Sequence, residues 1–300
     1  MVAAGSRRTS VVGAVVLGAA LVTGPTSATA AGPAKPAIFH NGVWHLRTSL
    51  TSGPDTATFA YGRNGDVPVM GDWNADGGDT VGIARFPAGA TGSFTWFLRN
   101  SNTAGAATVT PFQFGAVRFV AVDRLGSIPI VGDWDGDGDD TVGVAQFGDN
   151  LTGGITFQLR NSNTAGPPDI VVTYGRTDLD YPIVGDWDGD GTDTVGVSRA
   201  PNRWLLRNSN SGGPADISFA FGASTPGIIE YAVPGDWDGD GSDNPGVVRN
   251  VPPSNAEGGA RNWLLRSSNS SGPATSNFLF GSEAFGIGLP SDFVPRLSWR

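Results

Sequence analysis

Short segments in which apolar and polar residues alternate recur from about residue 36 to the C-terminus, separated by Gly, Pro, Asn and Asp. One group of four such segments is Tyr181 to Val184, Thr194 to Arg199, Arg203 to Asn208 and Ile217 to Phe221. Alternation with a period of two residues is typical of a half-buried β-strand, whereas an amphipathic helix places its apolar residues three or four positions apart. Beyond residue 30 no stretch keeps the helical period. The pattern therefore predicts an all-β protein with short strands in groups of four.

Three motifs recur along the chain in a constant order. The aspartate loops read GDWNADGGD from Gly71, GDWDGDGDD from Gly132, GDWDGDGTD from Gly185 and GDWDGDGSD from Gly235. The second motif reads WHLR from Trp44, WFLR from Trp96, FQLR from Phe157, WLLR from Trp204 and WLLR from Trp263. The third is an aromatic residue followed by glycine, at Gly62, Gly115, Gly175, Gly222 and Gly281. The first aspartates of successive loops are 61, 53 and 50 residues apart. Four strands in a repeat of this length predict the blade of a β-propeller.

The number of motifs predicts five blades. The second and third motifs occur five times, but the aspartate loop occurs only four times. The repeat units are residues 67–115, 128–175, 181–222 and 231–281, and an incomplete unit of residues 36–62 that residues 290–300 complete. We expect a strand around Phe293 to Leu297 to pair with the N-terminal strands, which closes the ring and removes its free sheet edges. The alternatives are an open array or a ring that is completed between chains.

The first 30 residues have the pattern of a secretory signal peptide. Arg7 and Arg8 precede an apolar run from Val11 to Val22, and Ala28 to Ala30 fits a small-residue cleavage site. The run is too short for a comfortable membrane span, and no later segment is long enough. We therefore expect a secreted protein without a membrane span, in which residues 31–300 form one propeller domain.

Composition limits the chemistry. The chain of 300 residues has no cysteine and only two histidines, so it has no disulfides, and the usual ligands of zinc are nearly absent. Its formal net charge of -9 makes nucleic acid an unsuitable partner. The four loops hold 16 of the 28 acidic residues. Carboxylates this close repel one another, so something must compensate their charge.

The spacing within each loop predicts a cation site. Counted from the first aspartate, positions 1, 3 and 5 carry carboxylate or amide oxygens, and position 6 is glycine. Hard oxygen ligands at this spacing suit Ca²⁺ better than Mg²⁺. Position 2 is always tryptophan, which we expect to face away from the ion and into the sheet. The predicted ligands, with position 8 included, are Asp72, Asn74, Asp76 and Asp79, then Asp133, Asp135, Asp137 and Asp140, then Asp186, Asp188, Asp190 and Asp193, and then Asp236, Asp238, Asp240 and Asp243.

These loops, the aromatic–glycine ending and the strand after each loop resemble FG-GAP/VCBS repeats of the secreted bacterial type, which are similar to the repeats of integrin α-chain heads. The resemblance implies a β-propeller with about four structural Ca²⁺ ions. The family usually has an aspartate at position 9, where this chain has Thr80, Thr141, Thr194 or Asn244. Either position 8 or another ligand therefore completes each loop.

The sequence favours a binding function over catalysis. Repeated clefts around a ring, with Trp, Asn and Arg in each unit, suit a glycan or an extracellular polysaccharide. The alternative is a scaffold for protein–protein interaction or adhesion. A polysaccharide lyase or glycosidase is disfavoured because no nucleophile motif is present and no blade is specialised. We expect a monomer, with the tryptophans of the second motif in the core and its arginines bridging to neighbouring blades.

Overall fold

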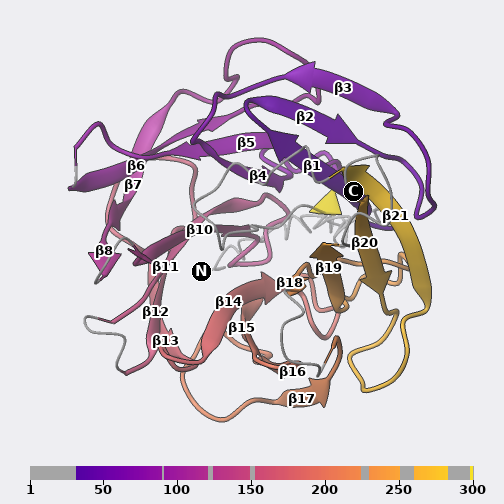
Figure 1. Ribbon diagram of the computed structural model, residues 1–300. Helices are drawn as coiled ribbons and strands as arrows, with labels where there is room; N and C mark the ends of the chain where they lie inside the picture. The colour runs from indigo at the N-terminus through magenta and orange to yellow at the C-terminus, as the bar shows by residue number, and fades with distance from the viewer. Residues whose placement is uncertain are drawn as a thin grey trace, which may run out of the picture.

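The computed structural model describes residues 32–89, 91–120, 124–148, 153–223, 230–250, 260–282 and 298–299. These residues form five antiparallel sheets of four strands each, arranged around a central axis as a five-bladed β-propeller (Figure 1). The described part of the chain contains no helix and hence no helix able to span a membrane. The predicted fold class, the five blades and the four strands in each blade are confirmed.

We number the blades along the chain and list their strands from the axis outward. Blade 1 contains β22 (Ser298–Trp299), β1 (Lys35–His40), β2 (Val43–Leu46) and β3 (Ala57–Ala60). Blade 2 contains β4 (Val67–Gly71), β5 (Thr80–Arg85), β6 (Gly92–Leu98) and β7 (Phe112–Val117). Blade 3 contains β10 (Ser127–Gly132), β11 (Thr141–Gln146), β12 (Ile155–Leu159) and β13 (Ile170–Tyr174). Blade 4 contains β14 (Asp180–Gly185), β15 (Thr194–Arg199), β16 (Arg203–Leu206) and β17 (Ile217–Ala220). Blade 5 contains β18 (Glu230–Ala232), β19 (Gly246–Asn250), β20 (Ala260–Leu265) and β21 (Ser276–Ser282). A small hairpin of β8 (Phe119–Val120) and β9 (Arg124–Leu125) connects blades 2 and 3.

The two ends of the chain close the ring within blade 1. Strand β22 pairs antiparallel with β1, with Lys35 opposite Trp299 and Pro36 opposite Ser298. Figure 1 places the C-terminal end of the chain beside β1. Closure by N- and C-terminal strands is therefore confirmed. The pairing residues come directly after the predicted segment around residues 293–297, which lies outside the described residues.

A close contact at glycine joins each blade to the next. The glycine of the third motif has a positive φ, for example 75° at Gly115, which favours a residue without Cβ. A Cβ at Gly115 would lie 2.1 Å from Cγ2 of Val144 in the next blade. Equivalent glycines face a β-branched residue of the next blade in the pairs Gly62 with Ile83, Gly115 with Val144, Gly175 with Val197 and Gly281 with Ile38. At Gly222 the close neighbour in the next blade is Glu230, whose Oε2 would lie 2.5 Å from a Cβ, whereas Val247 would lie 3.5 Å away. The third motif is therefore a place where adjacent blades pack closely.

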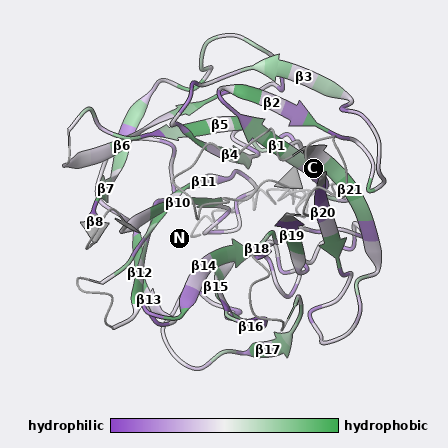
Figure 2. Ribbon diagram, viewed as in Figure 1, coloured by the Kyte–Doolittle hydropathy of each residue, from purple (hydrophilic) through white to green (hydrophobic). Residues whose placement is uncertain are grey.

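The second motif lies in the core, as expected. Trp44, Trp96, Trp204 and Trp263 have an exposed fraction of at most 1%. Each indole N–H donates to the carbonyl of the aromatic residue before the third-motif glycine, as from Trp96 to Phe114 at 3.1 Å. Figure 2 shows hydrophobic residues concentrated along the strands. These tryptophans are therefore buried and do not form a surface for stacking on sugars.

We expect Gly115→Ala to lower the free energy of unfolding by roughly 2–5 kcal/mol, because it adds left-handed backbone strain and overpacks the blade boundary. Gly65→Ala is the matched control. Gly65 also has a positive φ, of 84°, but a Cβ there would meet nothing within 4 Å. Its cost should be only about 1–2 kcal/mol of strain. Denaturant unfolding of both variants checks this prediction. If the two variants lost the same free energy of unfolding, the close contact between blades would be contradicted.

Candidate metal centre

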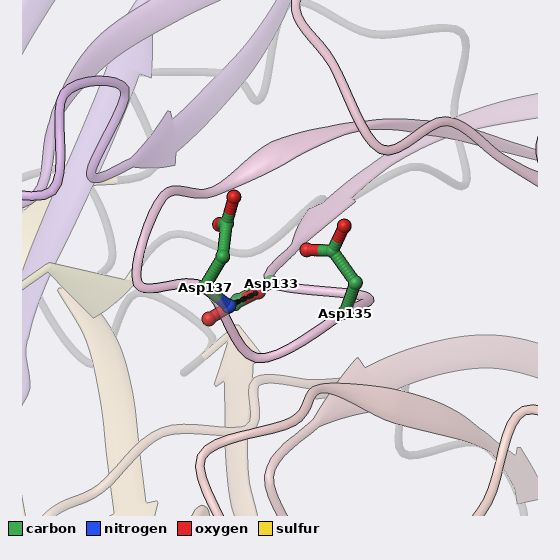
Figure 3. Close-up of side chains that lie close together, drawn as sticks. All are labelled: Asp133, Asp135 and Asp137. Carbon is green, nitrogen blue, oxygen red and sulfur yellow. Dashed lines mark hydrogen bonds between the residues drawn. The ribbon is translucent and has the colours of Figure 1, made fainter. Parts of the chain in front are cut away.

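Three of the four aspartate loops bring three carboxylates together at one end of the inner strands. One oxygen from each member of a group lies within 4.8 Å of the others. The groups are Asp133, Asp135 and Asp137, then Asp186, Asp188 and Asp190, and then Asp236, Asp238 and Asp240. Figure 3 shows Asp135 and Asp137 on either side of Asp133. The predicted convergence of positions 1, 3 and 5 is therefore present in these loops.

The first aspartate organises each loop. Oδ1 of Asp133 accepts the N–H groups of Gly136 at 2.7 Å and Asp137 at 3.2 Å, and Oδ2 accepts that of Gly138 at 2.8 Å. Gly136 and Gly138 have φ values of 73° and 98°, which turn the chain around this carboxylate. Asp186 and Asp236 accept the equivalent bonds in their own loops. Each of these loops is thus folded around a carboxylate that is half-buried at Asp133 and buried at Asp186 and Asp236, while positions 3 and 5 remain exposed.

The loop of blade 2 differs in its donor atoms. Asn74 replaces an aspartate at position 3, and its Nδ2 donates to Oδ2 of Asp76 at 2.9 Å. Ala75 adopts a φ of 55° where the other loops have glycine. Asp72 still accepts the N–H groups of Asp76 and Gly77. This loop therefore offers two carboxylates and one amide oxygen, with one negative charge fewer than its equivalents.

The aspartate at position 8 points to the preceding blade. Oδ2 of Asp193 in blade 4 accepts the N–H of Asp133 in blade 3 at 3.1 Å, and the N–H of Asp193 donates to the carbonyl of Asp133 at 2.7 Å. A Cβ at Gly132 would lie 2.6 Å from Oδ2 of Asp193, so this glycine makes room for the carboxylate. Asp140 with Asp72 and Asp243 with Asp186 form the same pair of bonds. Position 8 therefore links two loops and is not part of the three-carboxylate groups.

The chain end replaces this link at the ring closure. The N–H of Ala34 donates to the carbonyl of Asp236 at 2.6 Å, as the position 8 residue does elsewhere. Ala34 has no side-chain carboxylate that could accept the N–H of Asp236 as position 8 does in the other blades. Asp79 in blade 2 is the position 8 aspartate whose preceding blade has no aspartate loop, and it is buried.

An asparagine three residues after the arginine of the second motif supports each aspartate loop. The sequence reasoning did not recognise this role. Nδ2 of Asn163 donates to the carbonyl of Asp140 at 2.9 Å. Asn102, Asn210 and Asn269 make the equivalent bond to Asp79, Asp193 and Asp243. In all four asparagines Oδ1 is buried without a hydrogen-bond partner among the described residues. The sequence contained one signal for this role. The incomplete unit, residues 36–62, has Leu50 where the other units have this asparagine, and it is also the unit without an aspartate loop.

The expected role of the repeated arginines is wrong. Arg160 donates to the carbonyls of Thr164 at 3.0 Å and Pro167 at 2.8 Å, which belong to its own loop and not to a neighbouring blade. The loop turns back over the guanidinium because Gly166 leaves no side chain in the way, and a Cβ there would lie 2.6 Å from Nη2.

The tryptophan at position 2 of the aspartate loop faces the sheet, as predicted: Trp134 is 2% exposed and packs into the core.

The loops concentrate negative charge. Burial raises the pKa of Asp133 and Asp186 despite the N–H groups that they accept. Burial, followed by the hydrogen bond and charge of Asp137, raises the pKa of Asp139 to about 7. The donors at positions 1, 3 and 5 are all oxygens, with no nitrogen or sulfur ligand. Such a donor set fits a hard divalent cation, which the crowded carboxylates would prefer to a proton.

Comparison with protein-family models, with curated proteins and with solved structures gives no match for this chain.

We expect the stability of the metal-free protein to fall as the pH rises from about 4 to about 7. The folded state binds a proton at Asp139 more tightly than the unfolded state does, so this contribution is present at low pH and is lost as the pH passes the raised pKa. Asp139→Asn should flatten the dependence, and Ca²⁺ should weaken it in the parent protein. Melting temperatures in chelator across this range test the prediction, and a metal-free protein that gains stability with pH would contradict it.

Asp193→Ala should destabilise the protein even in chelator, by about 1–3 kcal/mol, because the partly buried N–H of Asp133 loses its acceptor. Asp188→Asn is the control, since Asp188 is exposed at position 3. This control should leave the metal-free stability unchanged and reduce only the gain on adding Ca²⁺. Urea unfolding in chelator and in Ca²⁺ separates the two effects. If Asp193→Ala acted only in the presence of Ca²⁺, its role would be that of a ligand and not of a link between blades.

Proposed function

We propose that this protein is a secreted, calcium-stabilised β-propeller of the FG-GAP/VCBS type that binds carbohydrate without catalysis. The observation that carries the proposal is the recurrence of converging carboxylates on one face of a ring of similar blades. Oxygen-only donors with several exposed members suit Ca²⁺, which accepts six to eight oxygen ligands in flexible geometry. The residues that would hold the ions are those at positions 1, 3 and 5 of each loop.

The cation would stabilise the face that carries the loops. It neutralises carboxylates that otherwise repel one another. The first aspartate folds its loop by accepting backbone N–H groups. The aspartate at position 8 of the next blade then bonds to the backbone of that first aspartate and links the two blades. One site at a free Ca²⁺ concentration of 100 times its Kd would stabilise the fold by about 2.7 kcal/mol. The ions thus take the structural role that disulfides have in many secreted proteins.

Repeated polar groups on the same face support carbohydrate as the ligand. Each blade carries a pair of neighbouring hydroxyl groups, such as those of Ser101 and Thr103, whose oxygens lie 3.0 Å apart. In blades 2 to 5 this pair flanks the asparagine that bonds to the aspartate loop. The equivalent pairs are Ser49 with Thr51, Ser162 with Thr164, Ser209 with Ser211 and Ser268 with Ser270. Equivalent weak contacts around a ring favour a polymeric, repeating ligand through avidity. A protein-binding or adhesion scaffold uses the same repeated surface and is the second candidate.

A non-catalytic role is supported by the acids on the opposite face. Asp66, Asp180 and Glu230 precede or begin the inner strands, and each is occupied by an arginine. His45 is buried in β2, and its Nδ1 lies 2.6 Å from Oδ2 of Asp55. These groups are engaged in structural pairs, which favours a binding module over an enzyme.

The test is a glycan and polysaccharide binding screen in Ca²⁺ and in chelator, with melting temperatures measured in both. We expect a higher melting temperature in Ca²⁺ and binding that depends on it. The double variant Asp188→Asn/Asp238→Asn should reduce both effects, whereas Asp178→Asn, on the opposite face, should change neither. If the melting temperature were the same in chelator as in Ca²⁺, the proposed binding of the cation would be rejected. A calcium-stabilised chain that binds no glycan would reject the carbohydrate and favour the protein-binding scaffold.

A further inference from the structure

The chain contains nine positions at which Asn or Asp precedes Gly. At such positions the backbone nitrogen of glycine can attack the preceding side-chain carbonyl, because glycine has no Cβ to hinder the approach. With Asn the attack expels ammonia and forms a succinimide, and water then opens the ring to Asp or isoaspartate. The reaction consumes water, needs no enzyme or oxidant, and depends on how freely the glycine nitrogen moves.

All seven Asp–Gly positions lie in the aspartate loops, where the glycine nitrogen is held. The N–H of Gly136 donates to Oδ1 of Asp133 at 2.7 Å, and that of Gly138 donates to Oδ2 at 2.8 Å. The same bond to the first aspartate of the loop is made by Gly77, Gly189, Gly191, Gly239 and Gly241. The contacts that shape the loops therefore keep each nitrogen away from the side chain that it would attack.

The Asn41–Gly42 position is constrained by packing. It forms the two-residue turn between β1 and β2, where His40 pairs with Val43. Gly42 is buried, and a Cβ there would lie 2.8 Å from the carbonyl oxygen of Gly62. The Asn41 amide is itself within 2.8 Å of Nε2 of His40. Ring closure here would require both the turn and its neighbours to move.

The Asn64–Gly65 position has none of these constraints. Both residues are exposed, and a Cβ at Gly65 would meet nothing within 4 Å. We propose that Asn64 is the site at which this protein is first modified, by spontaneous deamidation to a mixture of aspartate and isoaspartate. The site is independent of the aspartate loops and of the function proposed for them.

The modification acts on a buried ion pair two residues away. Asp66 is 1% exposed, its oxygens each lie 2.7 Å from a guanidinium nitrogen of Arg85, and it accepts the N–H of Arg63 at 2.9 Å. Isoaspartate at residue 64 lengthens the main chain by one carbon two residues before Asp66. The start of β4 would then lose its fixed position relative to β5. Plain aspartate at residue 64 adds only a charge at an exposed turn and leaves this geometry intact.

The experiment incubates the intact protein at mildly alkaline pH and follows tryptic peptides by mass spectrometry. We expect the peptide with Asn64 to gain the mass of an amide-to-acid change several times faster than the peptide with Asn41. Isoaspartate is detected there by enzymatic methylation with an isoaspartyl methyltransferase. Aged protein should show a lower melting temperature, which Asn64→Ser prevents and which Asn64→Asp in fresh protein does not reproduce.

Two results would overturn the proposal. One is conversion at Asn41, or at any Asp–Gly position of the loops, that is as fast as conversion at Asn64. The other is an Asn64 that stays intact while the unfolded chain, measured in denaturant as the reference, deamidates there. An aged protein that is modified at Asn64 yet melts like fresh protein would reject the effect on Asp66.

Discussion

The carboxylate of the first aspartate in each loop is the group on which one whole face of the propeller depends. In blades 3 to 5 it accepts N–H groups from positions 4 to 6 of its own loop. In blades 2 to 4 its backbone N–H and carbonyl bond to position 8 of the next blade. The same residue therefore sets the shape of one loop and the contact between two blades. Burial disfavours the charged form of this carboxylate, which is why the pKa of Asp133 and that of Asp186 are raised. A bound cation would relieve that cost without changing the hydrogen bonds around it.

The roles of the neighbouring motifs follow from their positions relative to this carboxylate. Tryptophan at position 2 anchors the loop in the sheet, and the asparagine of the second motif holds the carbonyl of position 8. The arginine that precedes this asparagine by three residues stiffens the segment from which the asparagine reaches the loop. Blade 1 keeps the tryptophan and arginine of the second motif, which serve the core and its own turn. It lacks the aspartate loop and the asparagine together, as expected if the asparagine serves the loop.

The sequence predicted features that depend on local spacing. The two-residue alternation, the repeat length and the count of motifs gave the strands, the blades and the closure by both chain ends. The convergence of positions 1, 3 and 5 also follows from spacing within one loop. Contacts between blades could not be predicted in this way, because they depend on the curvature of the ring. Position 8 was assigned to its own loop, whereas Asp193 reaches back to Asp133, and the arginines were assigned to neighbouring blades, whereas Arg160 wraps its own turn.

The alanine at the ring closure breaks the approximate fivefold symmetry at one point. Because Lys35 lies opposite Trp299, both ends of the described chain meet in blade 1, at the position where a fifth aspartate loop would otherwise stand. In the described part of the chain this face therefore carries an arc of four acidic loops and one position without such a loop. A long ligand lying across it would encounter a defined start and finish instead of a uniform circle.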